Sequence, residues 1–212
     1  LNFDTSAEEI FPCLASGGTL VLRSDEMLSS VAEFLRACDD WAITVLDLPT
    51  AYWHEIAAEF EKALTPLPRN LRLLIIGGER ALPERLSIWQ QNVGSSVRLV
   101  NTYGPTEATI VATNWEAPLS GAGGAPPKLP IGRPLGNVTV YLLDRKMNLV
   151  PIGVPGELHI GGAGLARGYL NRPELTAEKF ISDPFSGGAP ARLYKTGDLG
   201  RYLADGNIEY LG

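Results

Sequence analysis

Short apolar runs alternate with amphipathic stretches through the first half of the chain, and this alternation restricts the fold more than any other feature. Predicted buried strands cover residues 19–23, 43–48, 71–76 and 97–102, and stretches with helical spacing cover 25–38, 51–64 and 83–93. Strand, helix and strand in this order form right-handed βαβ units. The first half therefore predicts an α/β subdomain around a parallel sheet.

The predicted helix over residues 25–38 carries one apolar stripe. Its apolar residues recur at steps of three and four and are Met27, Val31, Phe34, Leu35 and Cys38. This position makes Cys38 a small core residue rather than a reactive thiol. The only other cysteine is Cys13, and two cysteines in 212 residues favour a reducing compartment, so we predict a cytoplasmic protein.

The composition changes after residue 116. Residues 117–130 are rich in glycine and proline and lack periodicity, which predicts a linker or surface loop. Short strands then dominate, and the predicted elements are strands 138–143, 156–160 and 207–211 and a helix at 173–180. We therefore predict an α/β subdomain at 1–116, a linker at 117–130, and a small antiparallel β subdomain, a distorted barrel, at 131–212.

Charge and hydropathy argue against two classes of partner. The net charge is −6 and no cluster of lysines and arginines occurs, whereas nucleic-acid binders usually present a basic face. No apolar run approaches the roughly 20 residues that a membrane helix needs. We expect neither nucleic acid nor a membrane as a partner.

The segment Asn101–Glu107, which reads NTYGPTE, directly follows a predicted strand. Open α/β sheets bind ligands at this end of their strands, and a Gly-Pro pair there makes a sharp turn. Tyr103 offers a flat face to a purine, Thr106 a hydroxyl to phosphate, and Glu107 a carboxylate to Mg²⁺. The alternative, for the turn taken alone, is a tight loop with a surface glutamate.

A second glycine-rich segment, residues 161–168, needs a different interpretation. It follows a hairpin signal and leads into no helix of the kind that a dinucleotide fingerprint requires. We interpret its glycines as sites of close packing in the β subdomain. His54 and His159 are interpreted as a helix-face residue and a strand residue, and no Ser/His/Asp or Cys/His constellation is evident.

Four ordered segments together resemble the adenylate-forming, AMP-binding superfamily, in the version found in amino-acid adenylation domains of nonribosomal peptide synthetases. They are FDTSAEEIFPCLASGGTLVL at 3–22, NTYGPTE at 101–107, GELHIGGAGLARGYLNRPELTAEKF at 156–180 and YKTGDL at 194–199. The resemblance covers essentially the whole chain.

The resemblance implies ATP and Mg²⁺ as cofactors. It makes Thr106 and Glu107 the catalytic residues, with Glu107 as the metal ligand, and Asp198 the acceptor for both ribose hydroxyls. For Asp198 alone, an aspartate in a Gly-Asp turn is the competing interpretation. The nucleotide-contacting positions that the resemblance implies are Gly78, Asn101, Thr102, Tyr103, Gly104, Thr106 and Asp198.

The same resemblance makes Asp4 the partner of the α-ammonium group of an amino-acid substrate. Acyl- and aryl-acid relatives lack this charge because their substrates lack the amine. The other implied substrate-binding positions are Thr5, Glu8, Asp47, Ile75, Gly77, Thr102, Ile110 and Val111.

Two carboxylates in one pocket repel each other unless a cation neutralises them. Asp47 lies in an apolar strand, where an unpaired charge is costly, and Glu8 is expected to face the same cavity. We therefore predict a basic substrate, with lysine first and ornithine or arginine next. The alternative is that Glu8 points to solvent and Asp47 caps a nearby helix.

In this family the substrate carboxylate attacks the α-phosphorus of ATP and pyrophosphate leaves. The aminoacyl group then passes to the phosphopantetheine thiol of a peptidyl carrier domain, in the same or another chain. The resemblance places the phosphate loop before Leu1 and a lysine-bearing C-terminal subdomain after Gly212, the first hinge residue. We expect this segment to be inactive without those N- and C-terminal portions.

Two other functions remain open. An acyl-CoA synthetase-type ligase is disfavoured by Asp4 and by the complete NTYGPTE segment. A non-catalytic nucleotide-binding remnant is disfavoured because Thr106, Glu107 and Asp198 are all present. Lys195 replaces the arginine that is more common in the ribose motif and keeps its charge.

Overall fold

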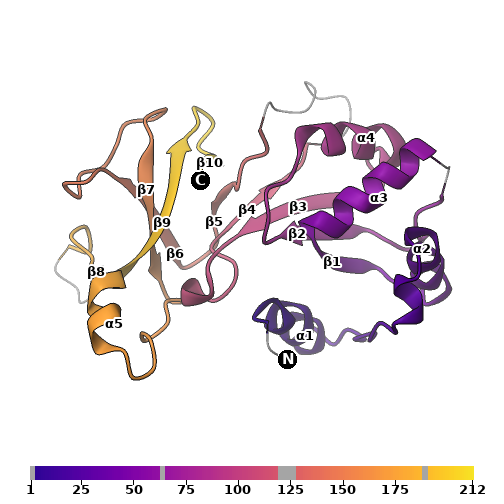
Figure 1. Ribbon diagram of the computed structural model, residues 1–212, viewed down its shortest axis with the longest axis horizontal. Coiled ribbons are helices and arrows are strands. Elements are labelled where there is room, and N and C mark those ends of the chain that lie inside the picture. Colours follow the sequence, from indigo (N-terminus) through magenta and orange to yellow (C-terminus); the bar gives the residue numbers. More distant parts are fainter. Residues whose placement is uncertain (1–2, 63–64, 119–127, 188–190) are drawn as a thin grey trace. The chain divides into compact units, whose positions relative to one another are not determined.

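A computed structural model describes residues 3–62, 65–118, 128–187 and 191–212 (Figure 1). The chain forms two compact units, and each is described by itself. The first comprises Leu1–Asn101 and Glu116–Leu129, and the second comprises Thr102–Trp115 and Pro130–Gly212. The residues from Thr102 to Trp115, which we grouped with the first half, thus belong to the second unit.

The first unit contains a parallel sheet with helices between its strands. Its elements are α1 (Thr5–Ala15), η1 (Glu26–Leu28), α2 (Val31–Asp40), β1 (Val45–Pro49), α3 (Thr50–Lys62), β2 (Leu73–Gly77), α4 (Pro83–Val93) and β3 (Arg98–Tyr103). Strands β1, β2 and β3 pair in parallel, with Asp47 beside Ile75 and Ile75 beside Val100. The predicted parallel α/β arrangement is confirmed.

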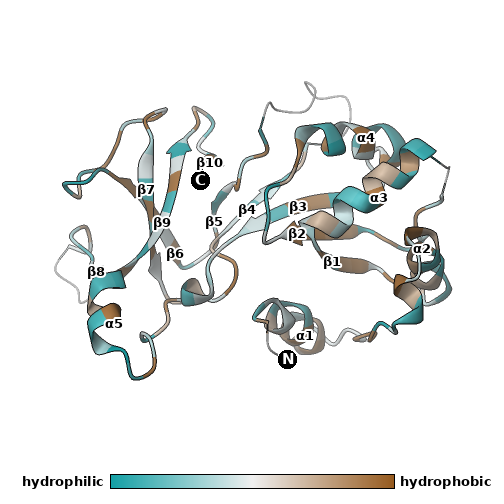
Figure 2. Ribbon diagram, in the orientation of Figure 1, coloured by the Kyte–Doolittle hydropathy of each residue, from teal (hydrophilic) through white to brown (hydrophobic). Residues whose placement is uncertain are grey.

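The core of the first unit lies where α3 and α4 pack together and α3 contacts the sheet. Trp53 and Ile56 of α3, Leu74 of β2 and Leu86 of α4 are fully buried. Figure 2 shows much of β1 and β2 in the hydrophobic colour. The Trp53 and Trp89 rings meet edge to face, with centroids 6.3 Å apart. Burying such side chains stabilises the unit by roughly 1.5–3 kcal/mol each.

The second unit is built mainly from antiparallel strands. Its elements are η2 (Thr106–Ala108), β4 (Thr113–Glu116), β5 (Arg133–Pro134), β6 (Val138–Leu143), β7 (Gly156–Gly162), α5 (Pro173–Lys179), β8 (Phe180–Ser182), β9 (Arg192–Tyr202) and β10 (Ile208–Tyr210). One sheet has the order β10-β9-β7-β6, with β8 paired to β9, and the other has the order β1-β2-β3-β4-β5. The predicted curled, antiparallel β half is confirmed.

An apolar cluster holds the second unit together. Ala108 and Ala112, which follow β3, pack with Leu142 of β6, Leu158 of β7 and Ile208 of β10. The glycine-rich segment packs as closely as predicted. A Cβ atom at its Gly162 would lie 2.1 Å from the Asn137 carbonyl oxygen.

The prediction of a strand at residues 19–23 is wrong. Residues 18–24 form no regular element, and Leu22 is 76% exposed. The apolar pattern suits a strand, but a strand also needs a neighbour for its backbone hydrogen bonds, and no strand of the described ranges pairs with this one.

The predicted helix 25–38 is divided by Ser30. Its hydroxyl oxygen accepts a hydrogen bond from the Glu33 N–H at 3.1 Å, which caps α2 and separates it from η1. The apolar stripe remains, because Met27, Phe34 and Cys38 are all buried. The expectation that Cys38 is a core residue is confirmed.

Several elements were not predicted, chiefly α1, β4 and the long strand β9. The middle of the predicted linker 117–130 lies outside the described residues. Its first residue packs in the first unit, where the Ala117 N–H donates to the Leu99 carbonyl at 2.8 Å.

Among the described residues, no helix has the length and apolarity needed to cross a membrane.

Candidate functional site

The structure joins two of the predicted nucleotide-binding segments directly. The Tyr103 hydroxyl, at the end of β3, donates a hydrogen bond to the Asp198 carboxylate on β9 at 2.6 Å, across 95 positions of sequence. Burial and the bond to Asp198 raise the pKa of Tyr103, so this phenol remains a donor at neutral pH.

A bulge in β9 turns the Asp198 carboxylate toward Tyr103. Opposite Leu158 of β7 the register of β9 shifts, and the Asp198 N–H leaves the ladder to donate to the Thr196 hydroxyl at 2.9 Å. That hydroxyl donates in turn to the Leu158 carbonyl at 2.8 Å, and Gly197 has a φ of 83°. Bulges of this kind re-aim a side chain.

Tyr210 of β10 is a site residue that the sequence did not single out. Its hydroxyl donates to the other Asp198 oxygen at 3.2 Å, and its ring lies 5.9 Å from that of Tyr103. A carboxylate offers about four acceptor positions, so two phenols leave room for two ribose hydroxyls. The alternation of β10 alone did not show which side of the strand faces Asp198.

The predicted catalytic pair occupies one tight turn, η2, directly after β3. The two residues that follow Ala108 both have left-handed backbones, with φ of 59° at Thr109 and 72° at Ile110. Such conformations in residues other than glycine cost energy and cluster at functional sites. The Glu107 side chain accepts a hydrogen bond from the Tyr169 hydroxyl.

Gly104 permits this turn because the chain folds back against it. A Cβ atom there would lie 2.4 Å from the Ile110 oxygen and 2.6 Å from the Ala112 nitrogen, both of which are backbone atoms. We expect Gly104→Ala to destabilise the turn by about 1–3 kcal/mol. Amide hydrogen exchange in the intact protein should therefore accelerate at least about fivefold in the peptide over residues 102–112.

The matched control for this prediction is Gly136→Ala, where an added Cβ atom meets nothing within 4 Å. The Ala112 amide, which donates to the Tyr103 carbonyl at 2.8 Å, is the most informative probe. Equal exchange rates at residues 102–112 in both variants would refute the steric role of Gly104.

The donor set around η2 suits Mg²⁺ better than a transition metal. No group of three or more His, Cys, Asp or Glu side chains within the described ranges could form an all-protein metal site. Mg²⁺ usually takes one or two carboxylates and completes its shell with substrate phosphates and water. The Glu107 carboxylate and the Thr106 hydroxyl fit that requirement.

In the first unit, Glu8 and Glu9 of α1 lie close enough to Asp47 of β1 for their charges to act on it. Burial, together with the charges of Glu8 and Glu9, raises the pKa of Asp47 to about 7. Burial, Glu9 and Asp4 likewise raise the pKa of Glu8. Figure 1 draws α1 on the β1 side of the sheet. One Asp47 oxygen, Oδ2, is buried with no hydrogen-bond partner among the described residues.

The other predicted substrate positions are divided between the units. Ile75 and Gly77 lie on β2 of the first unit, where Ile75 is the direct neighbour of Asp47, and Thr5 begins α1. Three others, Thr102, Ile110 and Val111, belong to the second unit. Of the predicted nucleotide positions, Gly78 and Asn101 belong to the first unit and the rest to the second.

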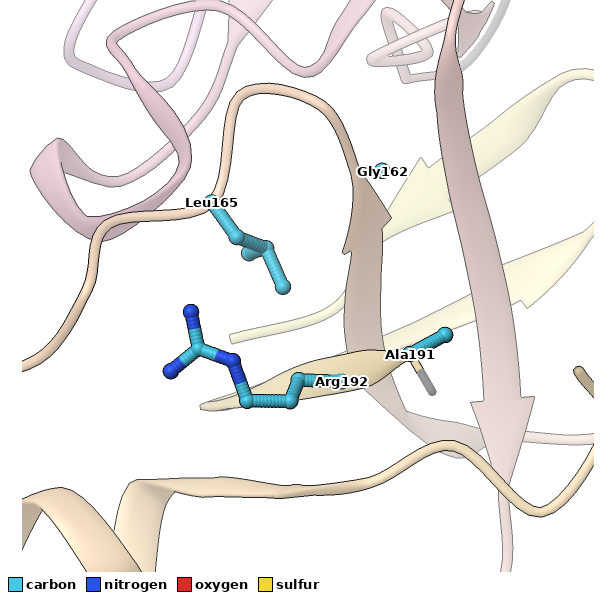
Figure 3. Close-up of a pocket in the computed structure, with 4 residues that line it drawn as sticks. All are labelled: Gly162, Leu165, Ala191 and Arg192. Atoms are coloured by element: carbon cyan, nitrogen blue, oxygen red, sulfur yellow. The ribbon is translucent and has the colours of Figure 1, made fainter. Parts of the chain in front are cut away.

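The hollow drawn in Figure 3 contains none of the predicted site residues. It has a volume of about 290 Å³ and is lined by Gly162, Leu165, Ala191 and Arg192. The Arg192 guanidinium is already bound, because it donates to the carbonyls of Arg167 at 3.0 Å and Ala166 at 2.9 Å.

Comparison with known proteins agrees with this geometry. Residues 1–170 match the family of AMP-binding enzymes. The chain belongs to this family of adenylate-forming ligases.

Within the family, its relatives are peptide synthetases. It is 47% identical over its whole length to an isonitrile lipopeptide synthase from Streptomyces coeruleorubidus and covers 14% of that protein. It is 46% identical to a malpibaldin synthetase from Mortierella alpina and covers 4% of it. It is 39% identical to tyrocidine synthase 1 from Brevibacillus parabrevis and covers 18% of it. The chain thus spans a small part of each relative.

Two solved structures share the fold. The N-terminal subdomain of Klebsiella oxytoca NpsA in complex with 3-hydroxybenzoyl-AMSN aligns with a TM-score of 0.81 and 26% identity, over 100% of this chain and 52% of that one. An artificially fused adenylation–PCP di-domain of NpsA and ThdA aligns equally well, over 41% of its length. The chain corresponds to part of an adenylation domain of the nonribosomal peptide synthetase type.

Proposed function

We propose that this protein activates an amino acid with ATP and Mg²⁺, forming an aminoacyl adenylate and pyrophosphate. The observation that carries the proposal is the hydrogen bond between Tyr103 and Asp198. It brings an aromatic face suited to a purine next to a carboxylate suited to ribose hydroxyls, beside the turn that carries Thr106 and Glu107.

In this proposal, the residues position groups and neutralise charge. A substrate carboxylate oxygen forms a bond to the α-phosphorus, the bond between that phosphorus and the bridging oxygen breaks, and pyrophosphate leaves with the electron pair. Phosphoryl chemistry of this kind depends on alignment and on the neutralisation of developing charge. Bound Mg²⁺ would supply much of that neutralisation, held by Glu107. Asp198 and Tyr103 would orient the nucleoside, and Thr106 would contact phosphate.

We further infer that the substrate has a basic side chain, with lysine first and ornithine or arginine next. Asp47 supports this inference, because burial and the charges of Glu8 and Glu9 raise its pKa to about 7, and a bound cation would stabilise the ionised carboxylate and partner its buried oxygen. In the same proposal, Asp4 would bind the α-ammonium group. These residues belong to one unit, which also supports their acting together.

The activated aminoacyl group is proposed to pass to the phosphopantetheine thiol of a peptidyl carrier domain, in the same or another chain. The thiol sulfur forms a bond to the aminoacyl carbonyl carbon, the bond from that carbon to the phosphate oxygen breaks, AMP leaves with the electron pair, and the thiol proton is released to solvent. The multidomain size of the synthetase relatives supports a carrier partner, as does the adenylation–PCP fusion among the structural neighbours.

The test is an amino-acid-dependent pyrophosphate exchange assay of the full-length protein that carries this chain. Lysine, ornithine and arginine should give the highest exchange, with leucine, phenylalanine and a fatty acid well below. Asp198→Asn should lower the exchange about 10- to 100-fold, because hydrogen bonds to a charged group contribute about 1.5–3 kcal/mol. A fatty acid as the preferred substrate would identify an acyl-CoA synthetase-type ligase, and no exchange with any acid would identify a non-catalytic remnant.

A further inference from the structure

The glycine-rich segment is bound tightly to the turn that carries Glu107, a connection that the proposed function does not use. The Ala166 N–H donates to the Glu107 carbonyl at 2.8 Å, and the Thr109 hydroxyl donates to the Gly164 carbonyl at 2.5 Å. A Cβ atom at Gly164 would lie 3.0 Å from the Ala108 carbonyl oxygen, so the two backbones approach closely. The segment therefore fixes the backbone of the turn.

The same segment also reaches the carboxylate itself. Tyr169, the residue that directly follows the segment, donates from its hydroxyl to the Glu107 Oε1 atom, and the Tyr194 hydroxyl of β9 lies 3.4 Å from that of Tyr169. Phe180 packs against both phenol rings, with centroids 5.7 Å from Tyr169 and 5.1 Å from Tyr194. Both phenols are thus fixed by ring packing and by hydrogen-bond partners within the unit.

This arrangement affects how readily the carboxylate can bind a metal ion. A free glutamate side chain loses rotamer entropy when it is fixed in one orientation. A hydrogen bond from a rigid phenol meets part of this cost in advance, and it uses only one of about four acceptor positions. Removal of a residue that hydrogen-bonds a metal ligand typically lowers metal affinity about 10- to 100-fold.

We propose that Tyr169 is a positioning residue that orients Glu107 toward Mg²⁺, supported by Tyr194, and that the glycine-rich segment holds the turn in the required place. Neither tyrosine contacts the substrate in this proposal. It rests on the proposed function, because that function assigns Mg²⁺ to Glu107.

The test compares Tyr169→Phe with the unaltered full-length protein, using calorimetric binding of adenylyl imidodiphosphate over a range of Mg²⁺ concentrations. We expect the variant to need about 10- to 100-fold more Mg²⁺ for half-maximal enhancement of nucleotide binding. Affinity without Mg²⁺ should stay within about twofold, because the phenylalanine ring keeps the packing on Phe180. Tyr141→Phe, which removes another phenol hydroxyl from a ring packed on Phe185, should match the unaltered protein.

A second variant separates positioning from general support of the fold. If Tyr169 acts through Glu107, then Tyr169→Phe adds no further loss of Mg²⁺ dependence to Glu107→Gln. An unchanged Mg²⁺ requirement in Tyr169→Phe, or an equal loss of nucleotide affinity with and without Mg²⁺, would overturn the positioning role while leaving the proposed function intact. Failure of the unaltered protein to bind the nucleotide would instead refute both.

Discussion

Glu107→Gln is expected to lower amino-acid-dependent pyrophosphate exchange by about 100-fold or more. The amide keeps the size of the side chain and can still accept the hydrogen bond from Tyr169, so the turn should keep its shape. It carries no negative charge, however, and is a poor ligand for Mg²⁺. A metal ion that neutralises transition-state charge contributes several kcal/mol, and each 1.36 kcal/mol corresponds to a factor of ten in rate.

The measurement is the exchange rate at saturating substrate, repeated at raised Mg²⁺, where a partial recovery is expected. Glu178→Gln, on the exposed surface of α5 in the same unit, makes the same chemical change away from the turn and should leave the rate unaltered. Glu107→Gln retaining more than about a third of the normal rate would contradict the assignment of the metal ligand.

Asp47→Asn is expected to lower kcat/KM for lysine by about 100- to 1,000-fold and to leave that for norleucine little changed or improved. Removal of one partner from a buried ion pair costs about 3–5 kcal/mol, because the other charge remains buried and unpaired. Norleucine has no charge to leave unpaired. The ratio of the two kcat/KM values therefore isolates the ion pair from any general effect on the fold.

The pH dependence provides an independent check, because the pKa of Asp47 is raised to about 7 in the folded protein. Below that pH the carboxyl group is protonated and cannot pair with a cation. The KM for lysine should therefore rise about tenfold for each unit of pH below 7 and level off above it, whereas the KM for norleucine should not follow this course. The lysine side chain stays protonated throughout this range.

The same raised pKa makes Asp47 a source of instability at high pH. A carboxyl group whose folded pKa exceeds its unfolded value favours folding at low pH, and this contribution is lost as the pH rises toward the folded pKa. Asp47→Asn should therefore unfold at a higher temperature than the unaltered protein at pH 8. Glu55→Gln, exposed on α3, is the control variant for the kinetic and the unfolding measurements on Asp47→Asn. A KM for lysine that does not vary with pH would refute the cationic pocket.

Local patterns were sufficient for much of the fold. The helix Pro83–Val93 and the strand Val138–Leu143 have the predicted ends, because apolar periodicity and a proline in the first helical turn act within a few residues. The strand at 19–23 failed for the opposite reason. Its backbone needs a neighbour, and a neighbour is not a local property of the sequence.

The candidate site likewise has features that follow from local sequence and features that depend on tertiary contacts. The sequence alone determined which chemical groups are present, because NTYGPTE and YKTGDL supply the Tyr103 phenol, the Thr106 hydroxyl and the carboxylates of Glu107 and Asp198 in recognisable order. Only the tertiary structure decided that Tyr103 meets Asp198, that Tyr210 joins them, and that Tyr169 reaches Glu107. Hydrogen bonds between residues 12 to 95 positions apart depend on strand register and on one bulge in β9, which are set by packing across the whole unit.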